Sequence, residues 1–169
     1  AGKLTVNISR NGKAYAEAVG RLVGENWDTM ETFVNRARGA DVLAVIRPEA
    51  VAAIEAAKAA GCKLAILSNE LDLFYGSAFR DRLPLMALFD VVVDATYTGI
   101  LKPDPRAYEL CTEQLVLPAS ACVFVDDQQR NVLGARRAGL QAVQLDVTAP
   151  HAAFGEALRL LGIAPALSG

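Results

Sequence analysis

The sequence predicts an α/β protein built on a doubly wound parallel sheet. Short apolar runs alternate with segments of helical periodicity, the clearest runs are apolar at nearly every position, and each of them stops abruptly at polar residues. Strands of a parallel sheet are covered by helices on both faces, which is why they read as continuous apolar runs. At 169 residues, 53% of them hydrophobic and 21% charged, the chain has room for one such domain and a small appendage.

The N-terminal part of the chain, residues 1–46, is predicted to form a small helical appendage. Residues 4–8 alternate apolar and polar side chains, as a half-buried strand does, and their placement is left open. Apolar residues between positions 13 and 38 recur at helical spacing with a break near Gly24, which favours two packed helices.

Residues 47–163 are predicted to form the α/β core, and residues 164–169 a frayed tail. Helices are expected to begin at Pro48, Pro105 and Pro150, because proline suits the first turn of a helix. Two further helices are expected to begin near Asp72 and after Asp127. Gly61 and Gly139 suit left-handed helix ends. The strands between these helices are expected at residues 63–67, 89–94, 121–125 and 141–145.

Composition excludes several classes of protein. A net charge of −2 with interspersed signs offers no basic face, so nucleic acid is not an expected partner. No apolar run approaches the roughly 18 to 20 residues that span a bilayer, and the first nine residues lack the features of a secretory leader, so we expect a cytoplasmic protein without a membrane partner. Oligomerisation stays open. Cys62, Cys111 and Cys122 form no CxxC pair and are expected to be buried thiols.

Three of the predicted strands have polar residues at or soon after their carboxyl ends. Ser68 and Asn69 follow the first strand, Lys102 comes soon after the second, and Asp126 and Asp127 follow the third. In a doubly wound parallel sheet, ligands bind outside the carboxyl ends of the strands. A hydroxyl, an amide, a cation and two carboxylates at that edge could hold a phosphoryl group and a hard divalent cation.

Each of these residues also has an ordinary structural explanation. Ser68 and Asn69 could start a turn, Lys102 could be a surface lysine, and Asp126 could cap the next helix. Capping explains one aspartate but not two adjacent ones, which repel each other without a counter-ion. The pair therefore favours Mg²⁺, which takes oxygen ligands and keeps several waters.

The order of these motifs resembles the haloacid dehalogenase superfamily of hydrolases, over about residues 48–161. The resemblance lies in three segments: Leu67-Ser68-Asn69, residues 99–105 with Tyr108, and residues 123–127 with Asn131 and Gly134-Ala135. The subgroup that it resembles contains the phosphatase-like N-terminal domains of soluble epoxide hydrolases. The resemblance implies a Rossmann-like core with a small helical cap over the site.

The resemblance also implies roles. Ser68 would bind the transferring phosphoryl oxygens with Asn69 supporting the pocket, Lys102 would neutralise charge, and Asp126 and Asp127 would hold Mg²⁺. The implied reaction transfers a phosphoryl group from a small metabolite to an aspartate, and water then hydrolyses the intermediate. Two other functions stay open, a 2-haloacid dehalogenase, for which the paired carboxylates have less use, and a non-catalytic relative that binds phosphate or Mg²⁺.

One motif of the family has no match. Its nucleophile lies in an Asp-x-Asp motif after the first strand, but the aspartates ahead of Ser68 are Asp28 and Asp41, and neither follows an apolar strand. Either a segment of a longer protein is not included or the protein is naturally non-catalytic; the first is favoured, and the chain as written is expected to be inactive. The missing strand would lie between those at residues 63–67 and 121–125, where residues 4–8 or another chain could replace it.

Overall fold

The computed structural model describes residues 46–76 and 78–163, together with positions 20, 21, 24, 29 and 32. The strand predicted at residues 4–8, the helices predicted between 13 and 38 and the tail lie largely or wholly outside this part of the chain. The division into cap, core and tail therefore stays a prediction. In the described part, no helix is both long enough and apolar enough to cross a membrane.

The chain separates into two compact units, each described by itself. One combines Ala1–Val45 with Glu70–Leu83, and its described helices are α4 (Leu71–Tyr75) and α5 (Phe79–Arg82). The other combines Ile46–Asn69 with Pro84–Gly169 and holds the strands. Its elements are, in chain order, α3 (Pro48–Ala59), β1 (Ala65–Ser68), η2 (Pro84–Leu88), β2 (Val91–Asp94), α6 (Ala95–Thr98), α7 (Pro105–Leu115), η3 (Ala119–Ala121), β3 (Val123–Asp126), α8 (Gln129–Arg137), β4 (Gln141–Gln144) and α9 (Pro150–Leu160).

The helix starts predicted at prolines are confirmed. Pro48, Pro105 and Pro150 stand in the first turns of α3, α7 and α9, where a missing backbone N–H costs nothing. Two of the predicted glycine turns are confirmed as well, since Gly61 and Gly139 have φ of +81° and +90°, a region that residues with a Cβ rarely enter.

Two helical segments differ from the prediction. The helix expected over residues 72–83 is broken into α4 and α5 beside Gly76, whose φ of +75° does not continue a helix. The short helix α6 was not predicted, because four residues carry no readable periodicity. The Asp94 side chain starts α6 by accepting a hydrogen bond from the Thr96 backbone N–H at 3.0 Å.

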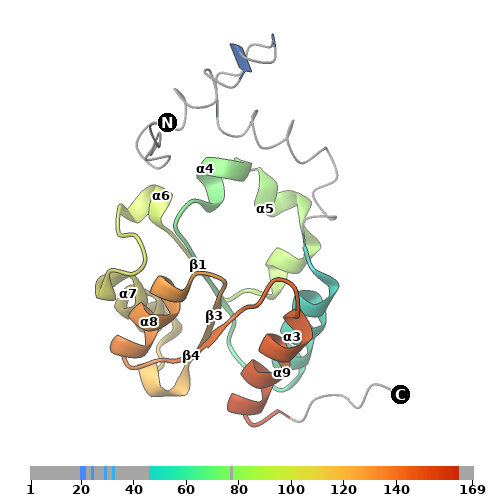
Figure 1. Ribbon diagram of the computed structural model, residues 1–169, viewed down its shortest axis with the longest axis vertical. Coiled ribbons are helices and arrows are strands. Elements are labelled where there is room, and N and C mark those ends of the chain that lie inside the picture. Colours follow the sequence, from blue (N-terminus) through green and yellow to red (C-terminus); the bar gives the residue numbers. More distant parts are fainter. Residues whose placement is uncertain are drawn as a thin grey trace, which may run out of the picture. The chain divides into compact units, whose positions relative to one another are not determined.

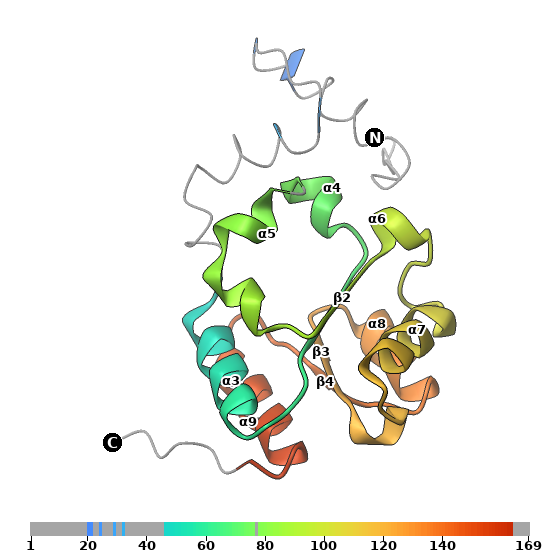
Figure 2. The ribbon, with the colours of Figure 1, turned by 180° about the vertical axis from the view of Figure 1, so that it is seen from behind.

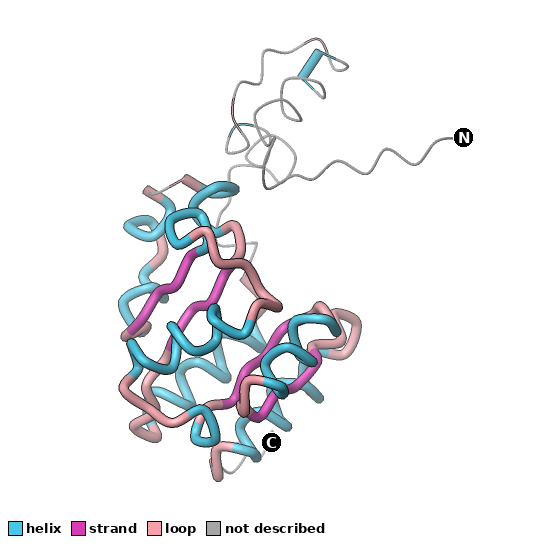
Figure 3. Tube along the Cα trace, turned by 90° about the vertical axis from the view of Figure 1, so that its left-hand side faces the viewer, coloured by secondary structure: helices cyan, strands magenta, loops and turns pink. Residues whose placement is uncertain are grey.

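The strands form two parallel pairs, which agrees with the predicted fold class. β1 pairs with β2 in the register Ser68 to Asp94, and β3 pairs with β4 in the register Asp126 to Gln144. Figure 3 shows the two pairs as separate ladders. Each strand lies within two residues of its predicted position.

Helices cover both faces of these strands. In Figures 1 and 2, α3 and α9 lie side by side on one face, and α7 and α8 lie on the other. α7 packs on β1 and β2, while α8 packs on β3 and β4. Buried core residues lie between α7, α8 and the strands and also between α9 and the strands. Two of the core residues, Tyr108 and Ala135, are fully enclosed.

The three cysteines are free thiols, and the predicted burial is confirmed for Cys111 and Cys122 but not for Cys62. Cys111 and Cys122 are buried in the core and Cys62 is half-buried, and none forms a disulfide. Burial raises the pKa of the Cys111 thiol to about 11 and also raises the pKa of Cys122, because a thiolate loses its hydration there. Cys111 and Cys122 are therefore inert packing groups at neutral pH.

Candidate active site

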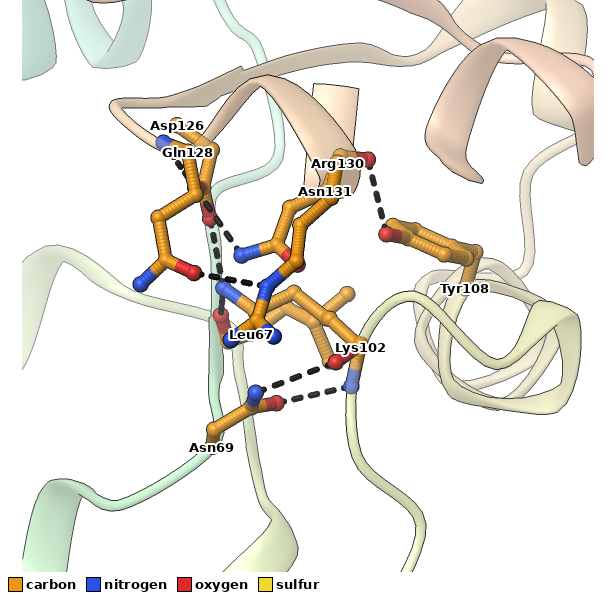
Figure 4. A network of polar contacts seen from close by, with 8 residues as sticks. All are labelled: Leu67, Asn69, Lys102, Tyr108, Asp126, Gln128, Arg130 and Asn131. Atoms are coloured by element: carbon orange, nitrogen blue, oxygen red, sulfur yellow. Dashed lines mark hydrogen bonds and ion pairs between the residues drawn. The ribbon is translucent and has the colours of Figure 1, made fainter. Parts of the chain in front are cut away.

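Lys102 links the carboxyl ends of two strands that belong to different ladders. Its Nζ donates hydrogen bonds to the Leu67 carbonyl oxygen in β1 and to Asp126 Oδ2 in β3, each at 2.7 Å (Figure 4). The Lys102 and Asp126 side chains are each only 9% exposed. The ammonium also lies 5.2 Å from the centre of the Phe124 ring, whose face attracts a cation.

Asn69 fixes the backbone on which this lysine stands. Its Oδ1 accepts a hydrogen bond from the Lys102 backbone N–H at 2.7 Å, and its Nδ2 donates to the Lys102 carbonyl oxygen at 3.2 Å. This two-way contact ties the end of β1 to the loop that carries Lys102. The amide of Asn69 therefore positions the lysine, and its predicted role in substrate binding stays a prediction.

The carboxylate of Asp126 is held by three donors. Asp126 Oδ1 accepts from the Gln128 backbone N–H at 2.8 Å and from Asn131 Nδ2 at 3.0 Å, while Oδ2 accepts from Lys102. The bond to Gln128 forms an Asx turn directly ahead of α8, whose N-cap is Gln128. Asp126 thus both shapes the turn into α8 and serves as the counter-ion of Lys102.

Tyr108, Asn131 and Gly134 support the network from behind. The Tyr108 hydroxyl donates to the Asn131 carbonyl oxygen at 2.8 Å, and both residues are almost wholly buried. Burial, with a smaller contribution from the nearby Asp126 carboxylate, raises the pKa of Tyr108 to about 12. A Cβ added to Gly134 would lie 2.7 Å from Pro103 Cβ and 2.7 Å from Tyr108 Oη, so only glycine lets α8 approach the Lys102 loop this closely.

Of the other two predicted site residues, Ser68 lies at the end of β1 and Asp127 directly follows β3. Ser68 ends β1 in register with Asp94 and is half-buried. Asp127 is exposed and lines an open hollow of about 530 Å³ together with residues 144–147. In the structure, Lys102 therefore contacts both Asn69 and Asp126. Ser68 lies between Leu67 and Asn69 in the sequence, and the Asp127 side chain is exposed to solvent.

The sequence alone did not assign roles to Tyr108, Asn131 or Phe124. A usable signal existed for Asn131, because five residues after Asp126 places it in the first turns of α8, where its side chain can turn back to the carboxylate. No spacing rule predicts that Phe124 lies under the lysine, since this contact joins β3 to a distant loop.

The acidic residues offer a limited set of ligands for a metal. Among the described residues, no group of three or more His, Cys, Asp or Glu side chains could hold a metal ion. Mg²⁺ is often held by one or two carboxylates, with waters and substrate phosphate completing its shell. Asp126 and Asp127 fit that pattern, although both oxygens of Asp126 are already hydrogen-bonded.

Fold and site together define a Rossmann-like α/β protein whose polar groups gather at the carboxyl ends of parallel strands. Residues 7–139 match the haloacid dehalogenase-like hydrolase family, and the chain belongs to that family. The family resemblance and the fold class predicted from the sequence are confirmed.

Curated relatives carry the names of hydrolases and of a dehydrogenase. The chain is 38% identical over 116 residues to acyl-CoA dehydrogenase family member 10 of Mus musculus, covering 68% of the chain and 10% of the relative. It is 37% identical over 99 residues to phosphatase MT3486 of Mycobacterium tuberculosis, covering 59% of the chain and 46% of the relative. It is 35% identical over 103 residues to phosphoserine phosphatase of Thermus thermophilus, covering 59% of the chain and 40% of the relative. The chain thus spans less than half the length of these relatives.

Solved structures share the fold. An uncharacterized protein from Corynebacterium glutamicum is 30% identical, with a TM-score of 0.60 and coverage of 69% of this chain and 83% of that one. CbbY from Rhodobacter sphaeroides, crystallised in complex with phosphate, is 25% identical, with a TM-score of 0.53 and coverage of 69% and 52%. Both pairings cover about the same share of this chain.

Proposed function

We propose that the protein, as the cell makes it, is a Mg²⁺-dependent phosphatase of small phosphorylated metabolites that works through an aspartyl-phosphate. The observation that carries the proposal is the buried Lys102–Asp126 pair at the carboxyl ends of β1 and β3. Phosphatase relatives and the phosphate complex of CbbY support the choice of substrate class.

The chain's own residues have separable tasks in this proposal. Lys102 places a fixed positive charge at the strand ends, where charge builds up on the phosphoryl oxygens. Ser68 offers a hydroxyl donor to those oxygens, and Asn69 holds the Lys102 backbone in place. Because Lys102 and its backbone are held by hydrogen bonds before a substrate arrives, they do not need to reorganise during the reaction.

Asp126 and Asp127 would hold the Mg²⁺. When bound, the metal offsets the negative charge of the phosphoryl group. Asp127 is the more accessible ligand, because its carboxylate makes no hydrogen bond or ion pair within the described part of the chain, whereas Asp126 has three donors.

The proposed nucleophile is an aspartate on a segment that the 169 residues do not include. Among the described residues, no aspartate lies on a strand that precedes β1 in the sequence and faces the Lys102 ammonium. We therefore propose that this chain alone does not turn over substrate, and that activity belongs to the longer protein.

The first prediction concerns Asp127. In the protein as the cell makes it, Asp127→Asn should lower the apparent affinity for Mg²⁺ by about 10- to 100-fold, because it removes the accessible carboxylate. The measurement is hydrolysis of para-nitrophenyl phosphate across a series of Mg²⁺ concentrations. Glu109→Gln, which removes an equally exposed acid from α7, is the matched control and should leave the Mg²⁺ dependence unchanged.

The same assay separates the rival functions. Turnover of para-nitrophenyl phosphate that disappears with a chelator supports the phosphatase. Turnover of 2-chloropropionate that survives the chelator would support a dehalogenase, and no turnover of either would support a binding relative. Full Mg²⁺-dependent activity in Asp127→Asn would contradict the metal assignment.

A further inference from the structure

The guanidinium of Arg130 is a second cation in the polar network of the candidate site. Arg130 stands in the first turn of α8, and its Nε donates a hydrogen bond to Gln128 Oε1 at 2.9 Å. The backbone N–H of Gln128 in turn binds Asp126, the partner of Lys102, at 2.8 Å. Figure 4 shows the Arg130 side chain turned back from α8 to Gln128, within the same network as Lys102. A second positive charge therefore stands close to the carboxyl ends of the strands.

The positive charge of Arg130 is not neutralised within the described part of the chain. Its side chain is exposed and bonds a neutral amide, and no ion pair of the described residues involves it. Even Asp127, three residues earlier in the sequence, does not pair with it. Three other arginines each pair with an aspartate or a glutamate: Arg80, Arg106 and Arg159. The charge of Arg130 is thus available to an anion from outside the chain.

The position of Arg130 on α8 is unfavourable for the helix itself. The helix macrodipole places partial positive charge at the N-terminus, which favours acidic residues in the first turn and basic residues in the last. The first turn of α8 holds Arg130 and no acid, whereas Arg136 and Arg137 occupy the last turn, where a cation is favourable. Helix stability therefore does not explain a cation at position 130.

The contact with Gln128 orients the guanidinium and leaves its terminal donors free. Within the described residues only Nε is engaged, so Nη1 and Nη2 keep their N–H groups for a ligand. The planar guanidinium matches two oxygens of a carboxylate or of a phosphate, and such two-pronged contacts are among the strongest hydrogen bonds in proteins. Because Gln128 carries no charge, it holds Arg130 in place without neutralising it.

We propose that Arg130 is a specificity-determining residue, which binds a second anionic group, a carboxylate or a phosphate, on the leaving group of the phosphate ester. This inference rests on the proposed function, because it places one part of that substrate. Lys102 then meets the phosphoryl group that is transferred, and Arg130 meets the group that leaves. Esters with a neutral leaving group forgo the Arg130 contact and bind more weakly.

The test is calorimetric titration of the protein as the cell makes it with phosphonates, which are not hydrolysed, in the presence of Mg²⁺. 3-Phosphonopropionate carries a carboxylate, 1,3-propanediphosphonate carries a second phosphonate, and propylphosphonate carries neither. We expect at least one of the first two to bind about tenfold or more tightly than propylphosphonate. Arg130→Met should bring this affinity ratio close to one. The ligand with the larger ratio identifies the second group as a carboxylate or a phosphate.

Arg137→Met is the matched control, because it removes an equally exposed cation from the last turn of the same helix. It changes the net charge by the same amount and should preserve the affinity ratio. Arg130→Lys should retain part of the ratio, since an ammonium keeps the charge but loses the planar pair of donors. A ratio near one in the unmodified protein, a ratio that survives Arg130→Met, or an equal fall in Arg137→Met would each overturn the inference.

Hydrolysis distinguishes a failure of this inference from a failure of the proposed function. If para-nitrophenyl phosphate is hydrolysed with Mg²⁺ but the affinity ratio does not depend on Arg130, the inference fails and the phosphatase stands. If the ratio depends on Arg130 but no phosphate ester is hydrolysed, the anion site stands and the phosphatase fails.

Discussion

At the scale of single residues, the ion pair with Lys102 accounts for Asp126 but not for the adjacent carboxylate of Asp127. Removing two charges from water is costly, and close contact with further hydrogen bonds is needed to offset that cost. Asp126 satisfies this condition through Gln128 and Asn131, and Lys102 satisfies it through Leu67. Asp127 has no such partner within the described residues, so a packing role does not explain it.

The second prediction is that Lys102→Met destabilises the fold. The substitution leaves the Asp126 carboxylate buried without its counter-ion, which costs about 3–5 kcal/mol for buried pairs. The measurement is the free energy of unfolding in urea. Lys58→Met is the matched control, because Lys58 and Asp90 form a similar pair at 2.8 Å whose side chains are 36% and 39% exposed, and water screens such a pair.

Equal stability losses in the two lysine variants would contradict the assignment of Lys102 as a buried counter-ion. If the proposed function is correct, Lys102→Met should also abolish phosphatase activity in the protein as the cell makes it. The free energy of unfolding is the more decisive measurement, because a partly unfolded variant loses activity whether or not Lys102 acts in catalysis.

At the scale of elements, the close approach of α8 to the loop before α7 sets the position of Lys102. Pro103 follows the lysine directly and faces Gly134 across this contact. Tyr108 of α7 lies at the same place and bonds the backbone of α8. The lysine is therefore held from two directions, by Asn69 at the end of β1 and by the packing of α7 and α8.

The third prediction concerns this contact. Gly134→Ala should destabilise the fold by about 1–3 kcal/mol, because the added methyl group overpacks against Pro103 and Tyr108. Gly155→Ala in α9 is the matched control: its added Cβ meets nothing within 4 Å, and alanine is favoured in helices by up to about 1 kcal/mol.

Urea unfolding of both glycine variants is the measurement. A Gly134→Ala variant as stable as Gly155→Ala would show that α8 can shift without cost. In that case the packing account of the Lys102 position fails.

The elements themselves were largely predictable from the sequence. Proline at positions 48, 105 and 150 and glycine at 61 and 139 act through their own backbone geometry, so local sequence was enough. The convergence of Asn69, Lys102 and Asp126 was predictable for a different reason, because the carboxyl ends of parallel strands meet at one edge of the fold. The Asn69 contact with the Lys102 backbone, the place of Phe124 and the break beside Gly76 depend on tertiary packing or on one residue's φ, which no periodicity reports.

At the scale of the whole molecule, two buried side chains make the free energy of unfolding decrease at high pH. The pKa of Cys111 is raised from 9.0 to about 11, and that of Tyr108 from 10.0 to about 12, because burial disfavours their charged forms. Both groups lose their protons more readily in the unfolded chain. Their contribution to stability is therefore complete below about pH 9 and is lost as the pH rises towards 12.

The fourth prediction follows from this linkage. Between pH 8 and pH 11.5, the free energy of unfolding of the unmodified chain should fall more steeply than that of a Cys111→Ala, Tyr108→Phe double variant, which lacks both titrating groups. Urea unfolding at several pH values provides the comparison. Parallel curves for the two proteins would show that neither group is as well shielded from water as the structure indicates.

The arrangement of the two ladders also bears on how the chain associates. A strand edge exposed at the margin of a sheet can recruit another copy, which presents a new edge in turn, and growth then has no natural end. Here each strand is only four residues long and lies between two layers of helices (Figure 1), so the strands offer another copy little edge to pair with. Short, covered strands of this kind disfavour edge-to-edge growth into fibres.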